Sequence, residues 1–244
     1  MRKFKDLETG KTLIVLGETN EHYIGIDLKK SKVSNLEKKT SVTEERTELS
    51  IADFPVLESI VNNTYAIAGQ ARTGKDTFAD KMEEVINKKY QDVYIYRSTL
   101  TTPIKKIQKI MFEADGKKNR DELIYIGQTL RINNPVIWIE TWLRYAIAEA
   151  EHALKTQKNI KILVTDVRQT NEIEFFQSLG AFIVKTEVAQ IDLQRKQLAL
   201  EGTSVTTVES TRTETDLLSF RNPDLLVLHN YDRDFTKEVE SILK

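Results

Sequence analysis

A nine-residue segment of the chain combines residue types that bind phosphate. It reads Gly69-Gln-Ala-Arg-Thr-Gly-Lys-Asp-Thr77 and fits the spacing GxxxxGK, with a threonine one place later than usual. The two glycines let the backbone curl so that successive N–H groups point at phosphate oxygens. Lys75 is placed to reach the β- and γ-phosphates of a nucleotide, and the Thr77 hydroxyl is placed to help hold Mg²⁺. The alternative is a strand–helix turn with a chance lysine. The residues predicted to bind the nucleotide phosphates are Gly69, Arg72, Thr73, Gly74, Lys75, Asp76 and Thr77.

A second group of chemically active residues follows an apolar strand. The segment Ile162-Leu-Val-Thr-Asp-Val-Arg168 ends in an aspartate and an arginine. In an open parallel sheet, ligands collect at the carboxyl ends of the strands, so Asp166 should lie near the phosphate loop. There it would serve the metal or position a phosphate acceptor, with Arg168 pointing to the same side. Lys75, Asp166 and Arg168 are therefore the predicted catalytic residues. The alternative is that Asp166 caps the helix that follows.

Several arginines are candidates for holding anionic groups, because a guanidinium matches two phosphate oxygens at once. They are Arg97, Arg120, Arg131, Arg144, Arg168, Arg195 and Arg212. Any single arginine can equally be a solvated surface residue, but Arg131 stands beside Asn133-Asn-Pro135 at a predicted helix break. Trp138 and Trp142 lie four residues apart on one predicted helix, which favours core positions, with base stacking as the alternative.

Alternating strands and helices must position these groups. After residue 62, strands are predicted at 65–68, 93–96, 160–164, 181–185 and 224–228. Helices are predicted at 76–89, 103–112, 121–130, 135–156, 172–179 and 234–243, two of them with proline at the start. This alternation predicts an α/β fold in which helices cover both faces of a parallel sheet.

The first 62 residues follow a different pattern and contain no motif for chemistry. Apolar runs at 12–17 and 22–28 predict a β-hairpin. From Lys29 to Ser50 the chain is highly charged, which fits either a further hairpin (32–35 with 40–43) or a solvated linker. A short helix is predicted from Asp53, with proline in its first turn. We therefore predict a small β-rich extension or module over residues 1–62 and a nucleotide-binding domain over residues 63–244.

The composition argues against several other classes of protein. The 36 basic and 37 acidic residues leave a net charge of −1, which argues against a general polyanion binder but is compatible with a local basic cleft. We expect no direct binding of nucleic acid. The absence of cysteine excludes disulfides, thiolate metal sites and cysteine nucleophiles, and only three scattered histidines disfavour a histidine metal site. No apolar run reaches the ~18 residues that span a bilayer, and no secretory signal opens the chain. We expect a cytoplasmic protein that does not enter membranes.

Several motifs together resemble the bacteriophage deoxynucleoside monophosphate kinases, a branch of the P-loop nucleoside monophosphate kinase fold. The resemblance covers roughly residues 63–244 and includes the phosphate loop. Further matching pieces are Pro103-Ile-Lys105, the spacing Arg120-x₆-Gly127-x₃-Arg131-x₆-Trp138 and, most specifically, Thr165-Asp-Val-Arg-Gln-Thr-Asn-Glu172. A weaker similarity lies at Glu209–Glu214, where family members often carry a histidine that this chain lacks.

The resemblance implies a P-loop kinase three-layer sandwich with a central parallel sheet, here with a β-rich N-terminal extension. It implies Mg²⁺-assisted transfer of a phosphoryl group from ATP to a deoxynucleoside monophosphate, in the host cytoplasm if the chain is phage-encoded. The implied acceptor site is Arg120, Arg131, Asp166, Arg168 and Glu172, the implied metal ligands are Thr77 and Asp166, and the implied lid contains Arg195 and Lys196, with Arg195 contacting the nucleotide.

Two other functions fit the same residues. One is a kinase of another small phosphorylated acceptor such as dephospho-coenzyme A, built on the same fold. The other is a nucleotide-binding interaction module that transfers nothing. The base that is accepted depends on the shape and polar groups of the pocket, so it is left open. The oligomeric state is also left open, with a homodimer as one option.

Overall fold

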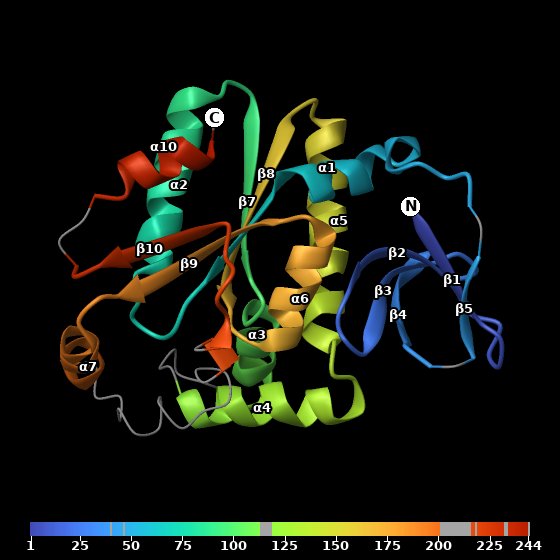
Figure 1. Ribbon diagram of the computed structural model, residues 1–244, viewed down its shortest axis with the longest axis horizontal. Helices are drawn as coiled ribbons and strands as arrows, with labels where there is room; N and C mark the ends of the chain where they lie inside the picture. Colours follow the sequence, from blue (N-terminus) through green and yellow to red (C-terminus); the bar gives the residue numbers. More distant parts are fainter. Residues whose placement is uncertain are drawn as a thin grey trace.

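The computed structural model describes residues 1–39, 41–45, 47–112, 119–200, 216–217, 219–231 and 234–243, with residues 120 and 197–200 described by their backbone alone. The chain builds two five-stranded sheets that lie side by side (Figure 1). The N-terminal sheet contains β1 (Arg2–Asp6), β2 (Thr12–Glu18), β3 (His22–Asp27), β4 (Lys32–Glu37) and β5 (Val42–Glu45). The central sheet contains β6 (Thr64–Ala68), β7 (Val93–Thr99), β8 (Asn159–Val167), β9 (Phe182–Val188) and β10 (Leu225–His229).

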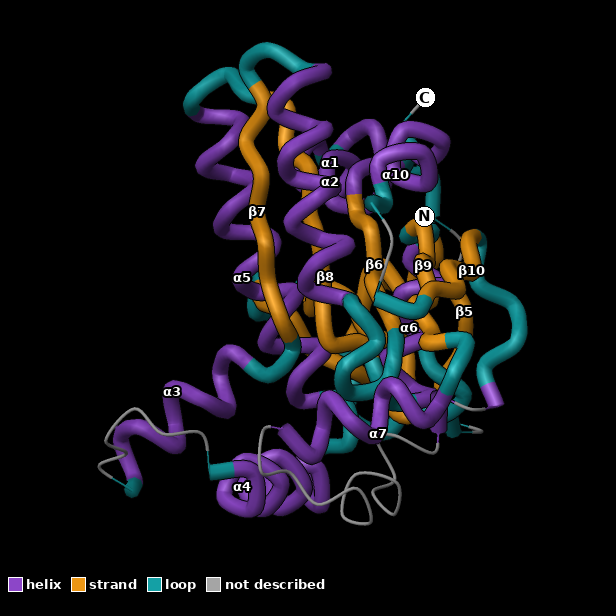
Figure 2. Tube along the Cα trace, turned by 90° about the vertical axis from the view of Figure 1, so that its left-hand side faces the viewer, coloured by secondary structure: helices purple, strands orange, loops and turns teal. Residues whose placement is uncertain are grey.

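The helices surround the central sheet. A short 3₁₀ turn (Ile51–Asp53) precedes α1, and the helices are α1 (Pro55–Asn63), α2 (Lys75–Lys89), α3 (Thr102–Met111), α4 (Arg120–Asn133), α5 (Ile137–Lys155), α6 (Thr170–Leu179), α7 (Ile191–Leu200) and α10 (Thr236–Ile242). One face of the sheet is covered by α1, α5 and α6, and the other by α2 and α10 (Figure 1). Beyond the carboxyl ends of the strands lie α3, α4 and α7 (Figure 2). No described helix is both long enough and apolar enough to cross a membrane.

The central sheet is parallel throughout its described pairings, in the order β10-β9-β6-β8-β7. After β6 the chain leads through α2 to the β7 edge, and after β8 it crosses through α6 to β9 on the other side of β6. The strand order therefore reverses at β6, and such a switch point is where open α/β sheets bind ligands. The predicted fold class, a three-layer α/β sandwich around a parallel sheet with a β-rich N-terminal extension, is confirmed.

The apolar periodicity located the elements of this part well, within a few residues at each end. The largest difference concerns β8, which continues to Val167 and thus includes Asp166. The strand lengthens because β6 and β7 pair with it on both sides. The helix α7 was not predicted, since its sequence Ile191-Asp-Leu-Gln-Arg-Lys has few apolar residues and its hydrophobic pattern is weak.

The N-terminal sheet has the order β4-β3-β2-β1-β5 and is antiparallel. The predicted hairpin of residues 12–17 and 22–28 is confirmed as β2 and β3. The charged region, however, is neither a second hairpin nor a linker, because β4 pairs with β3 while β5 pairs with β1. Opposite charges favour the latter pairing: Lys3 and Glu45 stand opposite each other, with Nζ and Oε2 2.8 Å apart.

The N-terminal sheet shares its core with the central part of the chain. On one face Phe4, Leu13, Val15 and Leu36 form a small cluster of their own. Side chains from the N-terminal strands also enter the main core, namely Leu16, Ile24 and Val33, together with Trp142, Phe175 and Phe176 of α5 and α6. The division into domains at residue 62 stays a prediction, but no solvated gap separates the two sheets at these residues.

Candidate functional site

The phosphate loop (residues 69–75) leaves the carboxyl end of β6 and enters α2. Two of its residues have to be glycine. At Gly69 a Cβ atom would lie 2.5 Å from Thr73 Oγ1 and 2.6 Å from Thr186 Oγ1. Gly74 has φ of 78°, in the left-handed region, and a Cβ there would lie 2.9 Å from Nε2 of His229. The glycine spacing that marks the motif therefore reflects close packing of the loop against β9 and β10.

Lys75 extends back across the loop. Its side chain is 5% exposed, and Nζ donates a hydrogen bond of 2.6 Å to the carbonyl of Gln70. The same Nζ lies 4.0 Å from Oδ1 of Asp166. A buried ammonium requires polar partners, and this carbonyl and carboxylate supply them at the mouth of the loop. The predicted neighbourhood of Lys75 and Asp166 is therefore present in the structure.

Asp166 occupies a β-bulge rather than a helix cap. The pairing of β6 with β8 shifts between Ile67 and Ala68, which leaves Asp166 unpaired with φ of 66°. Bulges of this kind re-aim a side chain next to functional sites. Its Oδ1 accepts a hydrogen bond of 2.9 Å from Arg168, and its Oδ2 accepts one of 3.3 Å from Thr101.

The charge of Asp166 is stabilised by its surroundings. Burial by itself would raise the pKa of this carboxyl. The positive charges of Arg168 and Lys75, with the hydrogen bond from Arg168, outweigh burial and hold the pKa of Asp166 well below its usual range. The carboxylate is therefore ionised at neutral pH, in a cluster that also holds two cations.

Glu172 connects this cluster to Arg131. Its side chain is 4% exposed, and Oε1 accepts a hydrogen bond of 2.9 Å from Arg131. Its Oε2 accepts the backbone N–H groups of Arg168 and Gln169, each at 3.0 Å, which caps α6. Glu172 thus fixes both the arginine at the end of α4 and the chain that follows β8. Whether it also contacts an acceptor stays a prediction.

The remaining predicted residues lie around this centre in different settings. Thr73 is buried, and its hydroxyl lies 2.9 Å from the Gln70 carbonyl and 3.0 Å from Thr186 Oγ1. Asp76 and Thr77 are exposed in the first turn of α2, where Asp76 pairs with Arg97 at 3.3 Å. The exposed Arg195 of α7 lies 3.7 Å from Asp192. Arg72 is exposed with φ of 61°.

Some predicted residues cannot be placed in the site. The side chain of Arg120, at the first position of α4, and the segment Glu209–Glu214, with Arg212, lie outside the described residues. Trp138 and Trp142 are both buried core residues, as their spacing predicts. Their indole N–H groups donate to the Gly127 carbonyl at 3.2 Å and to Ser98 Oγ at 3.0 Å.

Among the described residues, three whose side chains bind carbonyls of the phosphate loop were not predicted. The side chains of Gln194, His229 and Tyr231 donate hydrogen bonds to backbone carbonyls of the loop. Spacing along the chain gives no sign of these contacts, which join residues more than a hundred positions apart. His229 did carry one signal, because it directly follows the predicted strand 224–228, at the edge where ligands collect.

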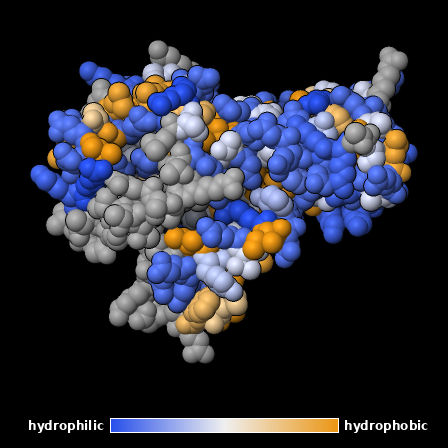
Figure 3. All heavy atoms as spheres, turned by 60° about the horizontal axis from the view of Figure 1, so that its bottom comes forward, coloured by the Kyte–Doolittle hydropathy of each residue, from blue (hydrophilic) through white to orange (hydrophobic). Residues whose placement is uncertain are grey.

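Mg²⁺ is the metal that the phosphate loop implies, and the donor groups present suit it. Among the described residues, no group of three His, Asp or Glu side chains is arranged to hold a metal ion by itself. Mg²⁺ bound with a nucleotide takes one or two protein oxygen ligands and otherwise phosphates and water. The carboxylate of Asp166 and the hydroxyl of Thr77 are oxygen donors of this kind. On the face at the carboxyl ends of the strands, the described residues are mainly hydrophilic, with apolar surface in separate patches (Figure 3).

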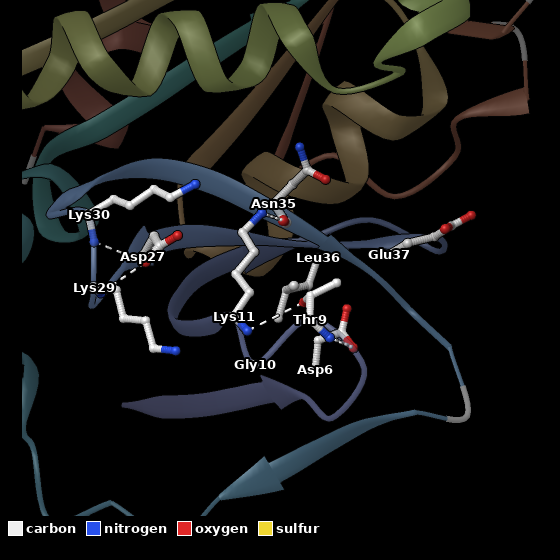
Figure 4. A pocket seen from close by; sticks show the side chains of 10 residues that line it. All are labelled: Asp6, Thr9, Gly10, Lys11, Asp27, Lys29, Lys30, Asn35, Leu36 and Glu37. Carbon is white, nitrogen blue, oxygen red and sulfur yellow. Dashed lines mark hydrogen bonds between the residues drawn. The ribbon is translucent and has the colours of Figure 1, made fainter.

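A separate pocket of about 340 Å³ lies in the N-terminal sheet (Figure 4). Its polar groups are used by the fold itself. The amine of Lys11 donates to the Asn35 carbonyl, and the carboxylate of Asp27 accepts the N–H groups of Lys29 and Lys30 at 2.9 and 3.1 Å. We therefore assign no ligand to this pocket.

Comparisons with known proteins add the following. No protein-family model matches the chain, and no curated protein matches its sequence. Among solved structures, one described as APE1195 is 12% identical with a TM-score of 0.37 and covers 74% of this chain and 92% of its own. The Mycobacterium tuberculosis APS kinase CysC, in complex with AMPPNP and APS, is 13% identical with a TM-score of 0.37 and covers 74% of this chain and 96% of its own. At these values neither likeness bears on the function of this chain.

Proposed function

We propose that this chain is a kinase that transfers the γ-phosphoryl group of ATP to a deoxynucleoside monophosphate. The observation that carries the proposal is the convergence of Lys75, Asp166 and Arg168 at the mouth of the phosphate loop. Arg131 joins the same cluster through Glu172. A site that binds only one nucleotide needs the loop, whereas a site for phosphoryl transfer also needs cations that hold a second phosphate.

Each group has a role in this proposal. The loop N–H groups and Lys75 hold the donor phosphates and stabilise the charge that develops during transfer. Arg168 and Arg131 align the phosphate of the acceptor for in-line attack. Asp166 keeps Arg168 and Lys75 in place and remains an anion at neutral pH, since its pKa is lowered. The acceptor attacks through an oxygen that is already anionic, so no strong general base is required.

Mg²⁺ would be held by Thr77 and Asp166 together with the nucleotide phosphates. When bound, it neutralises charge on the β- and γ-phosphates. The lid function implied for α7 belongs to the same proposal, because an open site would lose ATP to hydrolysis. Arg195 and Lys196 are the cations on α7 that such a lid would bring to the nucleotide.

The test is a coupled assay of ADP release with a panel of acceptors. The panel contains the deoxynucleoside monophosphates, the ribonucleoside monophosphates and dephospho-coenzyme A. Lys75→Met should lower the turnover of the preferred acceptor by at least about 100-fold, because it removes a charge that stabilises the transition state. The matched control is Lys88→Met on the same helix, whose lysine is 72% exposed. Its activity should stay at the wild-type level.

Three results would contradict the proposal. Fastest turnover of dephospho-coenzyme A would identify a different acceptor on the same fold. ATP binding without acceptor-dependent ADP release would identify a nucleotide-binding module. Retention of most of the turnover in a folded Lys75→Met variant would show that the loop is not the donor site.

A further inference from the structure

The outer carbonyls of the phosphate loop are held by side chains from distant parts of the chain. Nε2 of Gln194, on α7, donates to the Ala71 carbonyl at 2.6 Å. Nε2 of His229, at the end of β10, lies 2.8 Å from the Thr73 carbonyl. The hydroxyl of Tyr231, two residues later, donates to the carbonyl of Arg72. Three consecutive peptide groups of the loop are therefore each tied by one side chain, and we name Gln194, His229 and Tyr231 the carbonyl clamp.

The tautomer of His229 follows from its two contacts. Its Nδ1 accepts the backbone N–H of Tyr231 at 3.1 Å, so this nitrogen carries no proton. The Thr73 carbonyl can only accept, so Nε2 must carry the proton and donate it. Both contacts require the same neutral form of the ring. The rings of Phe235 and Tyr231 pack against the imidazole edge to face, each with centroids 5.3 Å apart, and keep it in this orientation.

Holding the carbonyls also orients the N–H groups of the loop. In a trans peptide the C=O and the N–H point in opposite directions, and the described chain has no cis peptide bond. Carbonyls turned toward the clamp therefore turn the N–H groups of Arg72, Thr73 and Gly74 the other way. The positive φ values of Arg72 (61°) and Gly74 (78°), on either side of Thr73, supply the left-handed residues that an anion-binding nest requires.

We propose that the carbonyl clamp holds the loop ready for the donor phosphates before a nucleotide arrives. Gln194, His229 and Tyr231 are thus positioning residues, which act through the loop backbone and not by touching the reacting atoms. The clamp also offsets the unfavourable conformation of Arg72, because a non-glycine residue at positive φ relaxes unless its surroundings hold it. This inference rests on the proposed function in one respect, the assignment of the loop to the phosphates of ATP.

The test measures the binding of inorganic tripolyphosphate and of ATP by calorimetry, because the clamp concerns phosphates and not the base. His229→Leu removes the hydrogen-bond donor to the Thr73 carbonyl. It should lower the affinity for both ligands about tenfold, as expected for one lost hydrogen bond. His229→Gln places an amide N–H near the position of Nε2 and should restore affinity to within about twofold. The KM of the acceptor should not change in either variant.

Tyr231→Phe provides a second variant that removes a single hydroxyl, in case His229→Leu fails to fold. This variant should bind tripolyphosphate several-fold more weakly than the wild type. Its matched control is Tyr90→Phe, which also removes a hydroxyl bonded to a backbone carbonyl, that of Leu243 at 2.9 Å, but at the opposite end of α2. The control should leave the affinity for tripolyphosphate unchanged.

The outcomes separate the clamp from the kinase proposal. Wild-type affinity for tripolyphosphate in folded His229→Leu and Tyr231→Phe would overturn the clamp, while phosphoryl transfer could still stand. Weakened binding in both variants without acceptor-dependent transfer in the wild type would support the clamp and overturn the proposed function. Absence of binding to the wild type would overturn both. An equal loss in Tyr90→Phe would assign the effect to general stability and also overturn the clamp.

Discussion

Gly17 provides a direct test of whether the N-terminal sheet folds together with the central sheet. It lies in β2 and faces α6. A Cβ atom at this position would lie 2.6 Å from Cε2 and 2.7 Å from Cδ2 of Phe175, and 3.1 Å from Oγ of Ser178. Phe175 is fully buried, so its ring has no free space to move into. Gly17→Ala therefore forces the two elements apart.

The size of the effect follows from two opposing contributions. Inserting a methyl group into a packed core costs about 1–3 kcal/mol. Replacing glycine by alanine within a strand returns roughly 0.5–1 kcal/mol of backbone entropy. The net loss in the free energy of unfolding is therefore about 1 kcal/mol. For a chain of this size, that loss lowers Tm by roughly 2–4 °C.

Tryptophan fluorescence during urea unfolding is the assay, because both tryptophans lie in α5 and neither lies in the mutated sheet. The ring of Trp142 is 6.1 Å from that of Phe175 and 4.8 Å from that of Phe176. The control is Gly127→Ala in α4, where a Cβ would meet its nearest atoms at 3.4 Å and helix propensity favours alanine. A fluorescence transition unchanged by Gly17→Ala, with an earlier loss of β-sheet signal, would show an independent N-terminal module and refute the reasoning.

Three further predictions concern carboxylates that are buried or partly buried. Because the folded pKa of Asp166 is lowered, its ionised form stabilises the protein above the unfolded pKa of about 3.9, and this contribution is lost as the pH falls through the folded pKa. The stability difference between wild type and Asp166→Asn should accordingly shrink between pH 5 and pH 2 in urea titrations, and a constant difference would contradict the assignment. Glu140→Gln should lower the free energy of unfolding by about 1–3 kcal/mol. Both carboxylate oxygens of Glu140 accept hydrogen bonds, from Asn35 and Asn134, whereas an amide has only one oxygen to accept with. An unchanged Tm would count against a stabilising role of these two hydrogen bonds. Glu172→Gln should raise the KM of the acceptor more than that of ATP in initial-rate kinetics, since it frees Arg131, and an equal change in both would point to a purely structural role.

Local patterns predicted those features whose causes are local. The glycine spacing identified the phosphate loop because a side chain at Gly69 or Gly74 would collide with neighbouring atoms. Asp166 was predicted to lie near the loop because parallel strands end at a common edge of the sheet, where ligands collect. The bulge at Asp166 was not predictable, since it arises from a register shift between two strands that are about a hundred residues apart.

The missed features depend on contacts between distant residues. The pairing of β5 with β1 was missed because each strand alone is short, charged and weakly patterned. Its partner is selected by contacts across the strands, among them charge pairs. The three scattered histidines were considered only as metal ligands, whereas His229 matters because the fold brings it to the carbonyl of Thr73. Residues of this kind are recognised only when the backbone carbonyls they bind are known.

The two ends of the chain hold opposite sides of the proposed site. On the donor side, His229 at the end of β10 and Tyr231, two residues later, bind carbonyls of the phosphate loop. On the proposed acceptor side, the N-terminal sheet contacts α5 and α6, the helices next to the ion pair of Arg131 and Glu172.

Those N-terminal contacts reach the acceptor side by two routes. The side-chain amide of Asn35 donates to Glu140 at 2.8 Å. Glu140 in turn accepts a hydrogen bond from Asn134, which caps the end of α4 three positions after Arg131. Asn20 binds Glu174 of α6 through its backbone at 2.9 Å, two positions after Glu172. Because a guanidinium must be held within a fraction of an ångström to align a phosphate, we expect the extension to influence the geometry of the proposed acceptor site. We therefore expect the extension to behave as one structural unit with the rest of the chain, which the Gly17→Ala variant tests.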